Sequence, residues 1–140
     1  GAHQARELAE QIAARASRDQ VVVIFPEATT SNGAGLRPFH PRLFAAAQDS
    51  GAALQPVALR YGEPDHLDPI APFIDDDRPV PHLWRILQHP GIRVEVRFLP
   101  LIVSQGLDRK TMARACREAI GASLGLNTSD MQTEAVKKPL

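Results

Sequence analysis

The chain has 140 residues, a length that fits one domain, because domains usually run to about 100–150 residues. Its 44% hydrophobic and 23% charged residues describe a globular protein with one core and exclude disorder over most of the chain. Lys+Arg and Asp+Glu both number 16, so no net charge would attract nucleic acid or an anionic membrane. No apolar run of about 20 residues is present, and we expect the chain itself to be soluble.

The N-terminal part predicts a helix, a strand and a long loop, in that order. Residues 2–18 are rich in alanine and place Leu8 and Ile12 one turn apart, which predicts a helix. Residues 21–25 form a continuous apolar run rich in valine, which predicts a strand buried on both faces. Residues 26–41 hold three prolines and two glycines, so this segment is expected to be a loop that carries function.

The rest of the chain alternates short helices and strands. In residues 92–99 apolar side chains alternate with charged ones, so we expect one face in the core and the other in solvent. Beyond residue 124 no pattern continues, and a mobile tail is expected. The predicted elements are a helix over 41–48, a strand over 53–61, irregular chain over 62–81, a helix over 81–88, a strand over 92–99 and a helix over 107–124.

This alternation predicts an α/β domain in which helices pack on a mixed, mostly parallel sheet. Three strands make a narrow sheet, and the first predicted helix follows no strand. We therefore expect residues 1–124 to be the C-terminal part of a larger α/β domain, and residues 125–140 to be the mobile tail.

Two sequence blocks carry a family resemblance. Residues 25–33 read FPEATTSNG and resemble the FPEGTRS block of the glycerophospholipid acyltransferases. Residues 36–44 (LRPFHPRLF) resemble the continuation of that block, and residues 54–59 (LQPVAL) resemble the next one. The resemblance is close over residues 5–61 and looser over residues 92–122. Two blocks in the right order and at the right separation make it much more specific than either block alone.

The resemblance implies an enzyme of phospholipid biosynthesis. Such enzymes transfer a fatty acyl group from acyl-CoA or acyl-carrier protein to a lysophospholipid such as 1-acylglycerol-3-phosphate. By this resemblance the parent protein works at the cytoplasmic face of a membrane, contacts the membrane surface, and needs neither a cofactor nor nucleic acid.

The FPEATTSNG block supplies the candidate acceptor-binding residues. In the resembled family, the glutamate and arginine of this block help to hold the glycerol phosphate. Independently of the resemblance, a carboxylate at a strand end, beside hydroxyls and a glycine turn, can bind polyol hydroxyls and leave N–H groups for an anion. The candidates are Glu27, Thr29, Thr30, Ser31, Asn32, Gly33 and Arg37.

Two departures from the family block leave the acceptor open. Ala28 stands where the family has glycine, and Thr30 stands where it has arginine. A guanidinium can hold a phosphate through two hydrogen bonds, whereas a threonine hydroxyl offers one uncharged donor. Either Arg37 or Arg42 replaces the missing cation, or the acceptor is not a phosphomonoester. The Thr-Thr form of the block also resembles the lyso-ornithine-lipid acyltransferases, which gives a second candidate acceptor.

Two other functions compete with these. A non-catalytic α/β module that binds a polyol or a phosphate would keep the same loop. A nucleotide-binding loop over residues 32–35 is disfavoured because no Lys-Ser/Thr follows and the glycine spacing is wrong.

The family's catalytic step requires a histidine followed five positions later by an aspartate, in which the histidine acts as general base and the aspartate orients it. None of the five histidines has an aspartate at that spacing. No catalytic residue is therefore assigned, the pair is expected upstream of Gly1, and the isolated chain is expected to be inactive. His40 is the only histidine in the loop, and it either contacts substrate or is solvated.

No metal ligand set is assigned either. His82 and His89 lack a nearby carboxylate or cysteine in the sequence, and the acidic run over residues 75–77 is typical of a solvated turn. Cys116, the only cysteine, is expected to be buried on the apolar face of the last helix. The cations of that helix form either a solvated stripe or a contact with anionic lipid; they are Lys110, Arg114 and Arg117.

Overall fold

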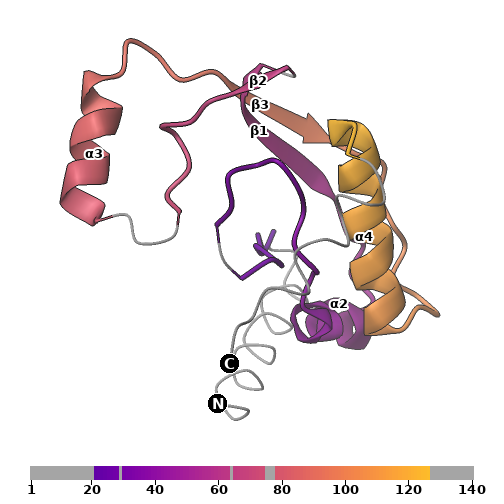
Figure 1. Ribbon diagram of the computed structural model, residues 1–140. Coiled ribbons are helices and arrows are strands. Elements are labelled where there is room, and N and C mark those ends of the chain that lie inside the picture. The colour runs from indigo at the N-terminus through magenta and orange to yellow at the C-terminus, as the bar shows by residue number, and fades with distance from the viewer. Residues whose placement is uncertain (1–20, 29, 64, 75–77, 127–140) are drawn as a thin grey trace, which may run out of the picture.

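The computed structural model describes residues 21–28, 30–63, 65–74 and 78–126, so the helix predicted over 2–18 and the tail from 127 lie outside the described residues. Figure 1 shows the arrangement of the elements. In chain order they are η1 (Pro41–Phe44), α2 (Ala45–Ser50), β1 (Val57–Glu63), β2 (His66–Leu67), α3 (Pro79–Gln88), β3 (Val94–Phe98) and α4 (Arg109–Leu124).

The helix ends follow from local residue chemistry. Pro41 lies in the first turn of η1, where its missing N–H costs nothing. Asp108 begins α4, because its carboxylate accepts hydrogen bonds from the backbone amides of Lys110 (2.8 Å) and Thr111 (3.1 Å). Gly51 and Gly125 end α2 and α4 in the left-handed conformation, with φ of 71° and 72°. The five helices and strands predicted after the loop are confirmed, with boundaries shifted by a few residues, whereas β2 lies in the stretch predicted to be irregular.

The sheet is antiparallel throughout its three strands, which lie in the order β2-β1-β3. β1 pairs with β3 from Val57 opposite Phe98 to Tyr61 opposite Val94. The expectation of a mostly parallel sheet is therefore not confirmed. It assumed that a helix crosses over the sheet between two strands, whereas α3 lies to one side of the sheet and the chain returns antiparallel.

The strand predicted over residues 21–25 is wrong. These residues form no strand, and Val21, Val23 and Phe25 are 94%, 73% and 76% exposed. A valine-rich run makes a strand only when another strand supplies hydrogen-bond partners and a layer covers its faces. No described segment does either for residues 21–25.

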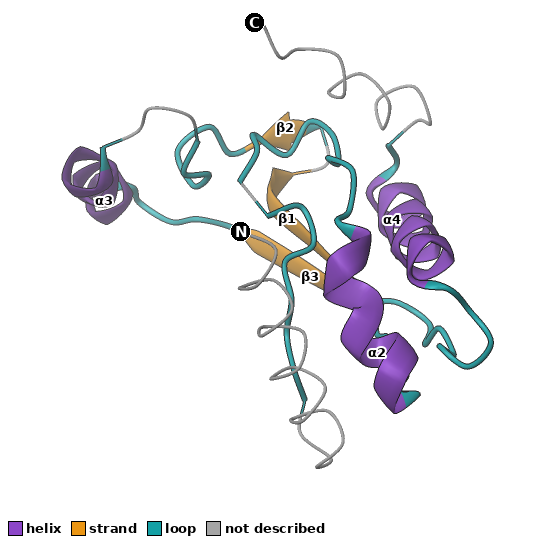
Figure 2. Ribbon diagram, turned by 90° about the horizontal axis from the view of Figure 1, so that it is seen from below, coloured by secondary structure: helices purple, strands orange, loops and turns teal. Residues whose placement is uncertain are grey.

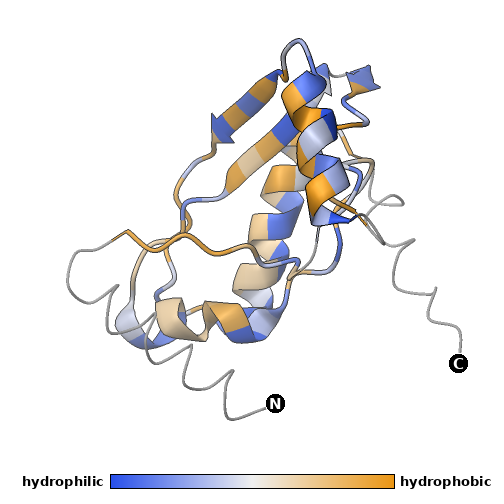
Figure 3. Ribbon diagram, turned by 90° about the vertical axis from the view of Figure 1, so that its left-hand side faces the viewer, coloured by the Kyte–Doolittle hydropathy of each residue, from blue (hydrophilic) through white to orange (hydrophobic). Residues whose placement is uncertain are grey.

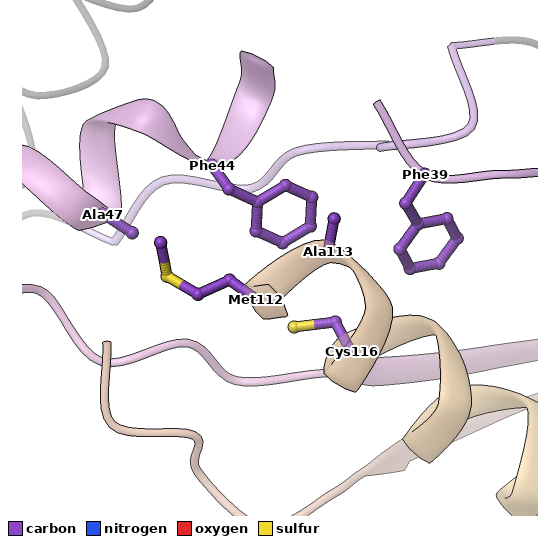
Figure 4. Packing of buried hydrophobic residues seen from close by; sticks show 6 residues of the cluster. All are labelled: Phe39, Phe44, Ala47, Met112, Ala113 and Cys116. Carbon is purple, nitrogen blue, oxygen red and sulfur yellow. The ribbon is translucent and has the colours of Figure 1, made fainter. Parts of the chain in front are cut away.

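The core lies between η1, α2 and α4, which pack side by side (Figure 2). Figure 4 shows the ring of Phe44 beside Ala113 and Met112. Met112 is fully buried, and Phe44 is 2% exposed. Cys116 belongs to the same cluster, so its predicted burial is confirmed. The cluster consists of Phe39, Phe44, Ala47, Met112, Ala113 and Cys116.

The sheet buries the opposite face from the one predicted to lie in the core. The apolar face stays open to solvent: Leu59, Val96 and Phe98 are 42%, 49% and 73% exposed. The charged face lies against the end of α4, where Arg60 donates to the carbonyl of Leu124 at 2.6 Å and Arg97 donates to that of Ser123. Cations are favourable at a helix C-terminus, which explains this contact. Figure 3 shows the alternation of hydrophobic and hydrophilic residues along both strands.

Candidate functional site

The 26–40 loop, defined as residues 26–28 and 30–40, is closed at its base by two hydrogen bonds. The amide of His40 donates to the carbonyl of Pro26 at 2.9 Å. Inside this pair, the Glu27 carboxylate accepts from the backbone amide of Arg37, also at 2.9 Å. Phe39 is 7% exposed and belongs to the core cluster, so the C-terminal side of the loop is fixed by packing.

Arg117 of α4 holds the same loop from the other side. Its guanidinium donates through Nε to the carbonyl of Arg37 at 3.0 Å and through Nη2 to the carbonyl of Leu36. Desolvation lowers the pKa of Arg117 below its usual value, and the negative charge of Glu27 acts in the opposite direction. Glu27 and Arg117 thus converge on the same short stretch of loop backbone, one through its carboxylate and the other through its guanidinium.

Ala28 occupies the left-handed region, with φ of 56°. Its amide donates to the carbonyl of Phe25 at 3.2 Å, which forms the turn that follows residues 21–25. A side chain is disfavoured in this conformation, whereas glycine adopts it freely. The turn therefore gives a physical reason for the glycine that the resembled block has at this position.

The tip of the loop is built from local turns. The side chain of Ser31 accepts from the amide of Gly33 at 3.4 Å, and that of Asn32 accepts from the amide of Ala34 at 3.1 Å. Thr30 makes a distant contact, because its hydroxyl donates to the carbonyl of Phe73 in the segment before α3. This bond uses the hydroxyl that stands where the family has a guanidinium.

The structure brings some predicted site residues together and separates others. Glu27 meets the backbone of Arg37 directly, whereas Thr30, Ser31, Asn32 and Gly33 form the tip, and Thr29 lies outside the described residues. His40 and Arg42 are exposed.

Sequence reasoning missed the contribution of Arg117, which it placed on a stripe that is either solvated or in contact with anionic lipid. A signal was present: Arg117 follows Ala113 by four residues and precedes Ile120 by three, so it shares a helix face with two apolar residues. The same stripe contains Arg114, which is exposed and pairs with Glu118 at 3.8 Å.

Two histidines outside the loop, His82 and His89, make structural contacts. His82 is 6% exposed and packs edge-to-face against Phe73, with ring centroids 5.1 Å apart. His89 lies 3.7 Å from the carboxylate of Asp68. The backbone amides of Ala71 and Ile70 lower the pKa of Asp68. Within the described ranges, no three histidine, cysteine or acidic side chains gather as a metal site would require.

None of the helices in the described part of the chain is long and apolar enough to cross a membrane.

Comparison with known proteins places this loop in a class of enzymes. Residues 1–60, which include the FPEATTSNG block, match the family model described as Acyltransferase. The lyso-ornithine lipid O-acyltransferase of Pseudomonas aeruginosa is 40% identical over 133 residues, covering 95% of this chain and 52% of that protein. The 1-acyl-sn-glycerol-3-phosphate acyltransferase of Neisseria gonorrhoeae is 36% identical, covering 75% of this chain and 42% of that protein.

A more distant relative is the human lysophosphatidylcholine acyltransferase 1, which is 30% identical and covers 92% of this chain and 24% of that protein. No solved structure matches. The chain belongs to the glycerophospholipid acyltransferase family. It spans about half the length of the first two bacterial relatives.

Proposed function

We propose that this chain is the acceptor-binding, C-terminal part of a lysophospholipid acyltransferase of membrane lipid synthesis. The observation that carries the proposal is the Glu27 carboxylate bound to the Arg37 amide at 2.9 Å, within a block that resembles the acceptor block of this family. The names of three relatives, each an acyltransferase acting on a lysolipid, support it.

The proposal assigns acceptor binding to the 26–40 loop and proton transfer to residues outside this chain. The chain contains no histidine with an aspartate five positions later, so the general base would come from another part of the enzyme. The open apolar face of the sheet is consistent with a larger α/β domain, and so are residues 21–25, which pair with no described segment. The acyl donor would be acyl-CoA or acyl-carrier protein, and the parent protein would work at the cytoplasmic face of a membrane.

Two acceptors fit the loop. With 1-acylglycerol-3-phosphate, the headgroup charge would be met by Arg37 or Arg42, because Thr30 has no charge and its hydroxyl donates to the carbonyl of Phe73. With lyso-ornithine lipid, no phosphomonoester needs a cation at residue 30. The 40% identity to a lyso-ornithine lipid acyltransferase supports the second acceptor, and the 36% identity to a 1-acylglycerol-3-phosphate acyltransferase supports the first.

The test is an acyl-transfer assay of the full-length enzyme on both lysolipids in parallel. Glu27→Ala should raise the acceptor KM or abolish turnover. Glu27→Gln keeps an oxygen that can accept from the Arg37 amide, so it separates loop closure from the carboxylate's charge. Glu118→Ala on the exposed side of α4 is the matched control. Unchanged kinetics in both Glu27 variants would contradict acceptor binding by this residue.

Thr30→Arg decides between the acceptors. It should strengthen use of a phosphate-bearing lysolipid by about 1–2 kcal/mol, the scale of a charge-assisted hydrogen bond. It should impair use of an amino-acid lysolipid, because a cation would be desolvated without an anionic partner. Thr30→Val removes the bond to the Phe73 carbonyl without adding charge and serves as the control. An equal effect on both lysolipids would mean that residue 30 does not face the headgroup.

A further inference from the structure

The backbone of Arg37 is held by two side chains that come from distant parts of the chain. The Glu27 carboxylate accepts from its amide at 2.9 Å, and the Arg117 guanidinium donates to its carbonyl at 3.0 Å. A second donor of Arg117, Nη2, bonds the carbonyl of Leu36. Pro38 follows and restricts the residue before it to extended conformations. Both polar backbone groups of Arg37 therefore have a side-chain partner, and the 26–40 loop is clamped at this residue.

The chemistry of this clamp favours an arginine at position 117. The carbonyls of Leu36 and Arg37 belong to successive residues, and the guanidinium meets them with two donors that lie in one rigid plane. A lysine ammonium is a point charge on a flexible stem and lacks this fixed fork. Arg117 is half-buried, and the charge of Glu27 favours its charged form against desolvation. The two members of the clamp thus support each other electrostatically.

Helix α4 supports Arg117 from both of its ends. Met112 and Cys116, which precede Arg117 in the helix, belong to the buried core cluster. At the C-terminal end, Arg60 of β1 donates to the carbonyl of Leu124 at 2.6 Å, and Figure 1 shows this end of α4 beside the strands. A side chain on a packed helix holds its contacts in place more precisely than one on a loop. The guanidinium therefore fixes the loop backbone relative to both the core and the sheet.

We propose that Arg117 is a positioning residue for the acceptor: through the carbonyls of Leu36 and Arg37 it holds the 26–40 loop in the form that binds the lysolipid headgroup. This inference rests on the proposed function, because it takes the 26–40 loop as the acceptor-binding element. It adds a residue of α4, about 80 positions further along the chain than the loop residues it holds. Release of the loop should weaken acceptor binding and spare the acyl donor, since the proposed function assigns only the acceptor to this loop.

A purely stabilising role of Arg117 predicts a different result. If Arg117 only held the fold together, its loss would lower the fraction of folded enzyme. Turnover would then fall without a change in the KM of either substrate. The split between the acceptor KM and the donor KM therefore separates positioning from stability.

Arg114 provides the matched control on the same helix. It lies three residues before Arg117, is exposed, and pairs with Glu118 at 3.8 Å. Substitution of Arg114 by lysine or glutamine makes the same chemical change away from the loop.

The experiment compares Arg117→Lys, Arg117→Gln and the two Arg114 variants in the full-length enzyme. Equilibrium dialysis measures the Kd of short-chain 1-acylglycerol-3-phosphate and lyso-ornithine lipid below their micelle concentrations, and the acyl-transfer assay gives the KM of acceptor and donor. Both Arg117 variants should raise the Kd and KM of the acceptor on the order of tenfold, with the donor KM within about twofold of wild type. The Arg114 variants should stay within about twofold throughout. Arg117→Lys keeps the charge beside Glu27, so it serves as the test if Arg117→Gln does not fold.

Three outcomes would overturn the proposal: an unchanged acceptor Kd in Arg117→Lys, an equal rise in the Arg114 variants, or an equal rise in the KM of acceptor and donor. The binding measurement also separates this inference from the proposed function. A wild-type enzyme that binds a lysolipid without acylating it rejects the proposed function, while the Kd comparison still tests Arg117. A wild-type enzyme that acylates a lysolipid, with unchanged acceptor Kd in both Arg117 variants, rejects the positioning role alone. Binding of neither lysolipid by the wild type rejects both.

Discussion

The helical half of the molecule and the sheet half treat their apolar residues in opposite ways. Phe44, at the end of η1, is 2% exposed and packs with Met112 and Cys116 of α4. Phe98, at the end of β3, is 73% exposed, and Leu59 and Val96 on the same sheet face are 42% and 49% exposed. In the helical half the apolar faces cover one another. In the sheet half the charged face is covered, and the apolar one is open.

This difference shows what each half needs from its surroundings. The helical half holds the 26–40 loop from both sides, through the burial of Phe39 and through the guanidinium of Arg117. The sheet half is stabilised by its hydrogen-bond ladder and by arginine contacts to the C-terminal carbonyls of α4. The helical half contains its own core, whereas the sheet half needs a further layer to complete its core.

The sharpest test of the comparison uses its two phenylalanines. Phe44→Ala should lower the free energy of unfolding by about 3–5 kcal/mol, because it leaves a cavity beside Met112. Phe98→Ala should cost less than about 1 kcal/mol, since only strand propensity is lost on an open face. Urea unfolding of the two variants measures both. Comparable losses would mean that the sheet face is covered in solution, and sedimentation would then identify self-association.

The second test breaks the link between the loop and α4. Arg117→Gln removes charge-assisted hydrogen bonds to the carbonyls of Leu36 and Arg37, and should cost about 2 kcal/mol of unfolding free energy. Arg114→Gln, one turn away in an exposed pair with Glu118, should cost less than about 0.5 kcal/mol. Hydrogen exchange should accelerate at the amide of Arg37 in the first variant only. Equal exchange in both would show that Arg117 does not hold the loop.

The sequence predicted the helical half well because its signals are local. Pro41, Asp108, Gly51 and Gly125 set the helix ends through their own backbone preferences. The spacing of Met112 and Cys116 marked the buried face of α4. These features need no knowledge of distant residues.

The sheet half was harder to predict because its outcome depends on partners. Alternation in residues 92–99 correctly separated an apolar face from a charged one, but it could not reveal which face a neighbour covers. Residues 21–25 carried a strong strand pattern and pair with no described segment. At the candidate site, the sequence block marked Glu27 as a candidate residue. The hydrogen bond from the Arg37 amide to the Glu27 carboxylate and the contact of Arg117 with the loop depend on tertiary packing, which the block does not contain.

A third test uses the pH dependence of the unfolding free energy to measure whether water reaches the helical core. Burial raises the pKa of the Cys116 thiol to about 11, from a usual value of 9.0. The unfolded thiol ionises first, so the stabilisation is complete below pH 9 and is lost as the pH rises toward 11. At pH 10 the loss should be on the order of 1 kcal/mol relative to pH 8. Cys116→Ala removes this group, so the difference between the two proteins isolates it. Parallel pH profiles would mean that water reaches the thiol.

The smallest expected effect concerns Ala28, at the entrance to the loop. Its φ of 56° lies in the left-handed region, which costs a residue with a side chain about 1–2 kcal/mol. Ala28→Gly relieves that cost but adds backbone freedom to the unfolded chain, worth about 0.5–1 kcal/mol in the opposite direction. The net expectation is a gain of about 0.5–1 kcal/mol in unfolding free energy, measured by urea titration. Gly33→Ala, at φ of 79° with only an ordinary contact to Leu67 near its added methyl group, is the reverse control and should destabilise. If Ala28→Gly destabilises instead, the turn after Phe25 does not hold residue 28 in the left-handed region in solution.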